Sequence, residues 1–223
     1  MMLMQKYLLL LLFCFLGACS VLSPVSTEET TKYVLNVHPQ PMQKKKLQRR
    51  NTLMVTTPEV KTIFSTTDML YSTSRFKVAA FAKNSWGDPP AQMLQPLIIQ
   101  AMQNTHYFTA VVSQSTLGDY DFILSSEIMD FKQIFFNRQS IFHLDLRAQI
   151  INGVTDKVVA SKEFSIDQPA PMNSPLGGVI AANCATEKLL EQIAAWYLQQ
   201  HTYPSQWKSS DVHPMQKYPN TLQ

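Results

Sequence analysis

The sequence is poor in glycine and cysteine and lacks the short motifs that accompany common enzymatic chemistry. Six glycines and three cysteines occur among 223 residues, so glycine-rich turns that cradle phosphate would be hard to build. It contains no G-x-S-x-G nucleophile elbow, no H-E-x-x-H zinc motif, no Walker loop and no C-x-x-C pair. We therefore expect a protein that is not an enzyme and that holds no metal or cofactor.

The five histidines are scattered, and only His143 has suggestive neighbours. Asp145 and Arg147 follow it at alternate positions, which places all three side chains on one face of a strand. The spacing leaves two interpretations open, a ladder of charges on a hydrated sheet face or a catalytic dyad. Same-face neighbours in a sheet commonly pair by charge, so we favour the ladder.

The charge balance limits the functions that the protein can have, and the length limits the number of its domains. The chain has 19 Lys and Arg against 16 Asp and Glu, a formal charge of +3, which is too small for a surface that neutralises many phosphates of a nucleic acid. Its hydrophobic content of 45% is enough for one ordinary domain with tails and not comfortably for two. We expect one globular domain that does not bind nucleic acid.

The N-terminus has the pattern of a secretory signal peptide. Residues 3–16 read LMQKYLLLLLFCFL, with a single Lys before an unbroken apolar block, and the small residues Gly17 and Ala18 follow. The apolar block is much shorter than the roughly 20 residues that a membrane-spanning helix needs. Residues 1–18 are therefore predicted to be removed.

The motif Leu16-Gly17-Ala18-Cys19 resembles a bacterial lipobox. The resemblance implies that Cys19 becomes the mature N-terminus and carries a diacylglyceryl thioether and an N-acyl chain such as palmitate. Each acyl CH₂ buried in a bilayer contributes about 0.8 kcal/mol. Ser20, in place of Asp, implies by similarity sorting to the outer membrane, with the domain facing the periplasm. The alternative is a soluble secreted protein that is cut nearby.

Two features of the mature chain have an ordinary and a functional interpretation. Cys184 lacks a second cysteine for a disulfide or a zinc site, so we expect a small buried side chain rather than a reactive thiol. Residues 44–50 contain a basic run of three lysines and two arginines. A solvated loop is the favoured interpretation, and contact with anionic lipid or an acidic partner is the alternative.

Residue patterns predict the elements of the first half of the domain. Residues 19–31 are polar and predict a flexible tether. Strands are expected over 32–37, 52–57 and 75–81, with 68–71 as a short edge strand. A helix is expected to begin at Asp88, whose carboxylate would cap free amides ahead of Pro89 and Pro90, and Pro96 should kink it.

The second half shows the clearest periodicity. Over residues 141–150 apolar and polar side chains alternate, which predicts a strand with one buried face. Strands over 120–131 and 158–166 flank it, and three sequential strands favour an antiparallel meander. A long amphipathic helix is predicted from Ser174-Pro175 to about residue 200. The domain then spans 32–200, and 201–223 form a polar tail.

Three segments together resemble the ABC-type transport auxiliary lipoprotein family. They are DMLY at 68–71, FAKNSWGDPPAQML at 81–94, and the pair Phe108 and Val111. The family pattern is a Tyr before a strand, a Trp ahead of a helix-opening Pro, apolar helix positions and a Phe-x-x-Val strand. The matching residues here are Tyr71, Trp86, Pro89 and Pro90, and the resemblance covers most of the chain between 33 and 198.

The resemblance implies a fold and a set of partners. The fold is α+β, with a mainly antiparallel sheet and two helices packed on one face. Family members act with a permease, an ATPase and a mammalian-cell-entry type substrate-binding protein to move lipids or other hydrophobic compounds between two membranes. This implies an accessory adaptor anchored in outer-membrane lipid through Cys19, with homo-oligomerisation left open. The longer basic loop and tail of this chain depart from the family pattern.

Alternatives remain for the motif residues and for the function. Trp86 either docks a partner or packs over the helix start, and the second role is favoured. The rival function is an assembly or plug lipoprotein for an outer-membrane β-barrel, and a periplasmic hydrolase is a distant third.

Overall fold

The computed structural model describes residues 29–41, 51–113 and 120–202, except for the side chains of 201 and 202. The chain divides into two units, Met1–Thr30 and Thr31–Gln223, and the fold below belongs to the second. The predicted signal peptide, the lipobox, the basic run and most of the C-terminal tail lie outside the described residues. Their predicted boundaries remain predictions.

Nine strands, two α-helices and one short 3₁₀ helix make up the described domain. In chain order they are β1 Thr31–Tyr33, β2 Thr52–Val55, β3 Glu59–Val60, η1 Thr62–Phe64, β4 Asp68–Ser74, β5 Lys77–Trp86, α2 Pro90–Gln103, β6 Ala110–Ser113, β7 Phe122–Phe136, β8 Gln139–Asn152, β9 Val158–Pro169 and α3 Pro175–Thr202.

Strand β7 is the central strand of the sheet. One edge pairs with β8 along its whole length, and β8 pairs with β9, so β7, β8 and β9 form the predicted antiparallel meander. The other edge of β7 is shared by β2, β3 and β4 in succession, all parallel to it. Beyond these, β2 pairs with β6 and β5 pairs with β1, again in parallel.

The fold is therefore α+β, but the prediction of a mainly antiparallel sheet is wrong. Of the pairings in the described sheet, only β4 with β5 and the two within the meander are antiparallel. Parallel pairs need long crossover connections, and here α2 is part of the connection between the parallel neighbours β2 and β6. The two tight connections of the meander are easy to recognise in a sequence, whereas pairings across long connections are not.

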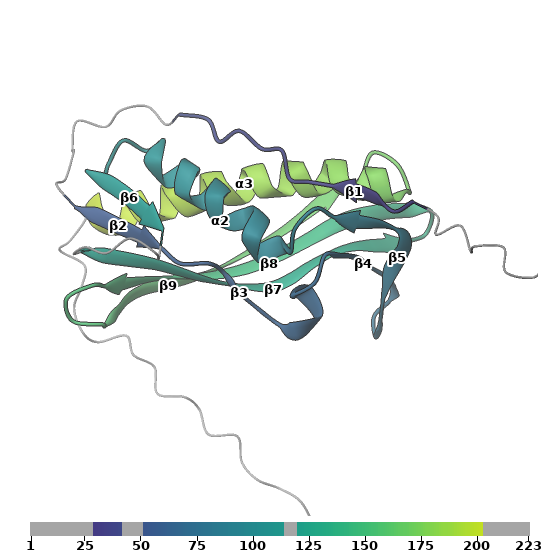
Figure 1. The fold of residues 1–223 in the computed structure, drawn as a ribbon, viewed down its shortest axis with the longest axis horizontal. Helices are drawn as coiled ribbons and strands as arrows, with labels where there is room; N and C mark the ends of the chain where they lie inside the picture. The colour runs from purple at the N-terminus through teal and green to yellow at the C-terminus, as the bar shows by residue number, and fades with distance from the viewer. Residues whose placement is uncertain (1–28, 42–50, 114–119, 203–223) are drawn as a thin grey trace, which may run out of the picture. The chain divides into compact units, whose positions relative to one another are not determined.

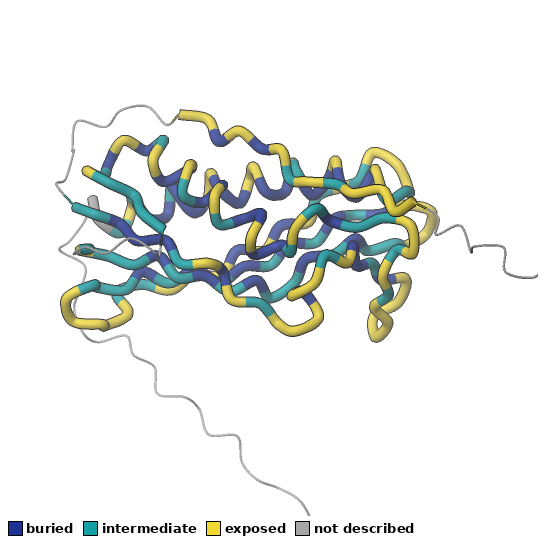
Figure 2. The backbone as a smooth tube through the Cα atoms, in the orientation of Figure 1, coloured by how far each residue is buried: buried dark blue, intermediate teal, exposed yellow. Residues whose placement is uncertain are grey.

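Buried and partly exposed side chains alternate along β8, as predicted, and the buried ones form part of the core. Leu144 and Leu146 have no exposed surface, while the intervening residues are partly exposed. Figure 2 shows the buried residues concentrated where the strands face the helices. The buried apolar side chains of β8 are Phe142, Leu144, Leu146, Ala148 and Ile150.

Both helices lie on the same side of the sheet (Figure 1). Helix α3 packs on β8 and β9, and α2 packs on α3 and the short strands β2 and β6. Ser174 precedes the first residue of α3 and caps the helix: its Oγ accepts a hydrogen bond from the backbone N–H of Gly177 at 3.1 Å. At Gly178 the helix approaches β7 so closely that an added Cβ would lie 2.3 Å from Oε1 of Gln133.

Three predicted elements differ in detail. β4 is not an edge strand, because it lies between β5 and β7; its short apolar segment in the sequence did not reveal neighbours on both sides. The predicted strand over 32–37 pairs only through Lys32 and Tyr33. Helix α2 begins at Pro90, with Pro89 at its N-cap and no side-chain capping bond, so Asp88 is not the cap.

Candidate functional site

Trp86 ends β5 and is part of the core. Its side chain is only 2% exposed, and its ring lies 5.6 Å from that of Phe131 and 6.5 Å from that of Phe142. Its backbone N–H donates to the carbonyl of Thr67 at 2.8 Å. A ring this deeply buried offers little surface to a partner, so its position favours the structural role over the docking role.

Tyr71 lies in an aromatic cluster at the base of the β4–β5 hairpin. Its ring stacks on Phe81 at a centroid distance of 4.5 Å and meets Phe135 edge-on at 5.9 Å. Phe81 and Phe135 are themselves 6.2 Å apart. Because the three residues come from β4, β5 and β7, the cluster fastens the hairpin to the central strand, and the half-buried ring of Tyr71 leaves part of this cluster at the surface.

Pro89 and Pro90 fix the entry of the chain into α2. Pro89 has an extended backbone, and Pro90 occupies the first turn, where a missing N–H costs no helical hydrogen bond. The carbonyl of Pro89 accepts from the N–H groups of Gln92 and Met93 at 2.9 and 3.2 Å. The two prolines therefore place the helix start immediately after Trp86, and Pro96 lies inside the helix.

After β1 an extended strap, residues 34–40, runs beside the helices (Figure 1). The N–H of Asn36 donates to Oδ1 of Asn183 in α3 at 2.7 Å, and Nδ2 of Asn104 after α2 donates to the carbonyl of Pro39 at 2.6 Å. Within the strap, the side chain of Val37 is buried. The strap therefore ties the two helices together.

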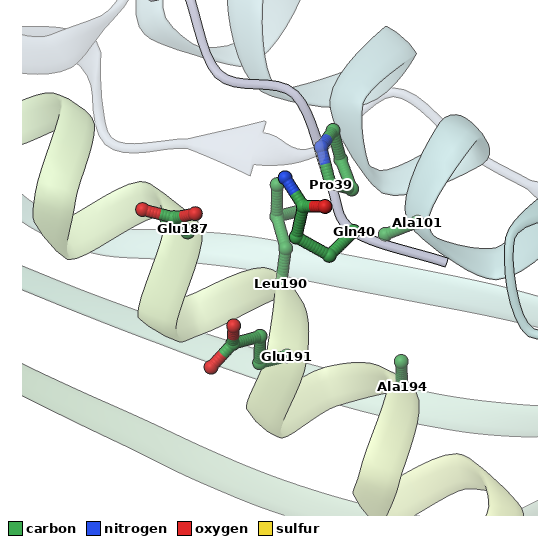
Figure 3. Close-up of a pocket in the computed structure, with 7 residues that line it drawn as sticks. All are labelled: Pro39, Gln40, Ala101, Glu187, Leu190, Glu191 and Ala194. Carbon is green, nitrogen blue, oxygen red and sulfur yellow. The ribbon is translucent and has the colours of Figure 1, made fainter. Parts of the chain in front are cut away.

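A small hollow lies between the strap, α2 and α3 (Figure 3). Its volume is about 50 Å³, enough for one or two water molecules and far too small for a lipid chain. Two exposed carboxylates, Glu187 and Glu191, stand beside an apolar floor. The lining residues are Pro39, Gln40, Ala101, Glu187, Leu190, Glu191 and Ala194.

The face of the meander opposite the helices carries the predicted charge ladder. Nε2 of His143 is 3.1 Å from Oδ2 of Asp145, and its Nδ1 is 2.5 Å from Oδ1 of Asp167. Arg147 bridges Glu163 at 2.7 Å and Glu127 at 3.1 Å.

The hydrogen bond from Arg147 to Glu163, together with the negative charge of that carboxylate, raises the pKa of the guanidinium group. Arg147 joins β8 to β7 and β9 through Glu127 and Glu163, and His143 joins β8 to β9 through Asp167. These are contacts between neighbouring side chains on a sheet, not the arrangement of a nucleophile with its base.

The remaining chemistry-bearing residues are dispersed in the part of the chain that the structure describes. No three His, Cys, Asp or Glu side chains within it gather as metal ligands. Cys184 is free and exposed on α3, so the expectation that it is buried is wrong; it lies one position away from the buried Ala185. None of the described helices combines the length and the hydropathy of a membrane span.

The predicted lipidation residue Cys19 and the motif residues Leu16, Gly17 and Ala18 lie outside the described residues. Of the sequence-predicted residues, the structure brings Trp86, Pro89 and Pro90 together at one chain reversal. It places Tyr71 in a separate aromatic cluster.

Sequence reasoning missed the tip of the β4–β5 hairpin. The segment was predicted to be part of a strand from Arg75 onward, but β5 begins at Lys77 and Phe76 is 93% exposed. The sequence signal is a single Phe between two cations directly after Ser-Thr-Ser, a polar run that favours a turn.

Comparisons with known proteins support one family. The family model described as the ABC-type transport auxiliary lipoprotein component matches residues 33–194. No curated protein matches the chain.

Among solved structures, protein XCC0632 from Xanthomonas campestris is similar, with a TM-score of 0.71, 19% identity and coverage of 79% of this chain and 99% of that one. A second, uncharacterized protein has a TM-score of 0.59 at 15% identity, covering 76% of this chain and 99% of that one. At these identities the two structures show the fold alone.

Proposed function

We propose that this chain, which belongs to the ABC-type transport auxiliary lipoprotein component family, is a non-catalytic accessory subunit of an envelope transport system. It is anchored in the outer membrane by lipid on Cys19 and faces the periplasm. Its partners are a mammalian-cell-entry type substrate-binding protein, an ABC permease and an ATPase. The cargo is a lipid or another hydrophobic compound.

The family match is the observation that carries the proposal. It spans residues 33–194 and therefore includes the described elements from β2 to β9 and most of α3, with only the last residue of β1. The match thus concerns the whole fold rather than one short motif.

Two described surface features bear on the adaptor role: the hollow beside the strap and the outer face of the meander. The hollow beside the strap holds about 50 Å³, whereas pockets for small molecules are typically about 300–1,000 Å³. The outer face of the meander, by contrast, is a broad polar surface with fixed charges, including Arg147 and Asp167. Charged surfaces of this kind give orientation and selectivity to protein docking.

Copurification tests the partners. The natively lipidated full chain is captured from its own envelope after mild crosslinking, with the Cys19→Ser variant as the matched control. We expect the wild type to recover at least one transporter subunit and the variant to recover much less, because the unlipidated chain is not held at the outer membrane. Recovery of an outer-membrane barrel without transporter subunits would instead favour the rival assembly function, and recovery of neither would contradict the proposal.

Processing of the precursor tests the anchor separately. Because the signal peptidase for lipoproteins acts after Cys lipidation, Cys19→Ser should leave unprocessed precursor, visible as a slower band on a gel. A mature form of the variant released into the periplasm would count against lipidation, whatever the copurification shows.

A further inference from the structure

The tip of the β4–β5 hairpin, defined here as residues 75–78, is the most exposed apolar feature of the described domain. Phe76 is 93% exposed and Val78 is 42% exposed. Figure 2 shows this hairpin projecting from one end of the sheet, on the side away from the helices, with an exposed tip. A single exposed hydrophobic residue is ordinary on a protein surface. Whether Phe76 marks a contact surface therefore depends on the residues around it.

The charges on the hairpin tip have one sign. Phe76 lies between Arg75 and Lys77, both exposed, and the Arg75 guanidinium is 5.7 Å from the centre of its ring. The adjacent β7–β8 turn adds Arg138 beside the half-exposed Phe136. Neither this turn nor the connection over 170–174 contains Asp or Glu, so the described turns at this end are basic and partly apolar.

The turn at the other end of the meander provides a contrast. Val154, between β8 and β9, is 82% exposed, but its turn contains Asp156 as well as Lys157 and has no net charge. Exposure of an apolar side chain is therefore common to both ends, whereas an aromatic ring framed by cations alone occurs at the hairpin tip. An aromatic ring among cations is the combination that binds the interfacial region of an anionic bilayer.

The N-terminal end of β1 points toward the hairpin tip. β5 runs away from the tip, and β1 is parallel to it with Thr31 opposite Asn84 and Tyr33 opposite Trp86. Thr31 is therefore the tip-proximal end of β1. From Asn84 to Lys77 a strand spans at most roughly 23 Å, while the segment from Cys19 to Thr31 reaches up to roughly 40 Å. The predicted tether is thus long enough for the tip to touch the membrane that holds Cys19.

The hairpin is braced well enough to present its tip. The Tyr71, Phe81 and Phe135 rings fasten its base to β7, and the Ser72 hydroxyl donates to the carbonyl of Ser74 at 2.6 Å near the turn. A fixed presentation lowers the ordering cost of docking.

From these observations we propose that the hairpin tip docks on a phospholipid bilayer. Phe76 enters the interfacial region, Arg75 and Lys77 contact anionic headgroups, and the helix side of the domain is thereby turned away from the membrane. The proposal rests on the proposed anchor at Cys19, but it adds a second contact that fixes the orientation of the domain.

Depth-dependent fluorescence quenching tests the contact. The natively lipidated full chain, carrying Phe76→Trp or the matched control Val154→Trp, is reconstituted in vesicles of phosphatidylethanolamine and phosphatidylglycerol with brominated acyl chains. The signal of the wild type, which contains Trp86, Trp196 and Trp207, is subtracted. We expect the tryptophan at 76 to be quenched several-fold more than the one at 154 and to shift to shorter wavelength.

The outcomes separate the tip from the anchor. If the protein floats with the vesicles but both new tryptophans respond equally, the docking proposal is overturned and the anchor stands. If the protein does not float with the vesicles, both are overturned. A photo-crosslinker at position 76 that attaches to a protein in native membranes, rather than to lipid, also overturns the proposal in favour of a protein partner.

Neutralising the cations provides an independent readout. In a Phe76→Trp background, Arg75→Gln and Lys77→Gln should each reduce the ratio of docked to undocked tips by roughly fivefold on anionic vesicles. On vesicles of phosphatidylcholine alone, which carry no net charge, the same substitutions should have little effect. Equal loss on both kinds of vesicle would show a structural effect on the hairpin and would contradict headgroup contact.

Discussion

The two faces of the β7–β8–β9 meander are made by the same strands but have opposite chemistry. On the face toward the helices, Leu144 and Leu146 are completely buried, and Phe164 of β9 packs against Trp196 of α3 at a centroid distance of 5.8 Å. On the other face the intervening residues form charge pairs, such as Arg147 with Glu163. One residue of displacement along β8 separates the two environments.

The contrast assigns different roles to the two faces. Burial of apolar area is the main source of stability, whereas exposed ion pairs contribute little. We therefore expect substitutions on the helix side to unfold the domain, and substitutions on the charged side to leave it folded while altering what it binds.

Trp86→Ala should be the most damaging of these changes. The side chain is 2% exposed and contacts Phe131 and Phe142, so its removal leaves a cavity that the neighbours cannot fill. We expect a loss of about 3–5 kcal/mol in the free energy of unfolding, measured by urea denaturation. Trp86→Phe is the control and should recover part of that loss. Unchanged stability with lost partner binding would contradict the structural role.

Gly178→Ala tests the close approach of α3 to β7. The new Cβ would lie 2.3 Å from Oε1 of Gln133, a buried side chain whose Nε2 donates to Ser140 Oγ at 2.9 Å. Despite the higher helix propensity of alanine, we expect a loss of about 1–3 kcal/mol from overpacking.

The control for this change is Gly87→Ala, whose Cβ would meet the exposed Val34 side chain at 3.0 Å. Because that side chain is free to rotate, the expected effect is small. A double variant with Gln133→Ala should be less destabilised than the sum of its single changes. Strict additivity would show that the contact is not the cause.

The buried phenol of Tyr197 should make stability sensitive to alkaline pH. Burial raises the pKa of this hydroxyl, with further contributions from Tyr107 and Asp121. Above a pH of about 10 the unfolded chain releases the proton and the folded chain retains it. Above that pH, this group should lower the free energy of unfolding by about 1.4 kcal/mol per pH unit. Below a pH of about 10 its stabilising contribution is present in full. Tyr197→Phe should flatten the slope in denaturation curves recorded at successive pH values; an unchanged slope would exclude Tyr197 as its source.

Arg147→Gln should have the smallest effect on stability. The Arg147 side chain is 39% exposed, and the side chains of its two carboxylate partners are 36% and 61% exposed. Water and salt therefore screen the pairs. We expect a barely measurable shift in the denaturation midpoint that disappears in high salt. A loss comparable with that of Trp86→Ala would break the division between the two faces.

Local patterns in the sequence predicted the elements that depend on local physics. Alternating residues revealed β8 and its buried face, and Ser174-Pro175 marked the start of α3 to within a residue. The side-chain ladder from His143 to Arg147 also followed from spacing alone. The aromatic and proline motif identified the family, whose model matches residues 33–194.

Features that depend on distant segments escaped prediction. The parallel pairing of β4 with β7 joins Tyr71 to Gln133, and nothing near either residue indicates its partner. The exposure of Cys184 depends on which side of α3 the strap and sheet cover. Asp88 has the residue type of an N-cap, but the helix begins two residues later, because the extended backbone of Pro89 already sets its first turn.

The most direct test of the account is the mass of the N-terminal peptide of the natural protein, extracted from membranes in detergent. Lipid anchoring predicts that the mature chain begins at Cys19 and that its mass exceeds that of the peptide by a diacylglyceryl group and an amide-linked acyl chain. A peptide beginning at Cys19 with a free thiol, or a mature chain that begins elsewhere, would contradict the anchor and the function proposed from it.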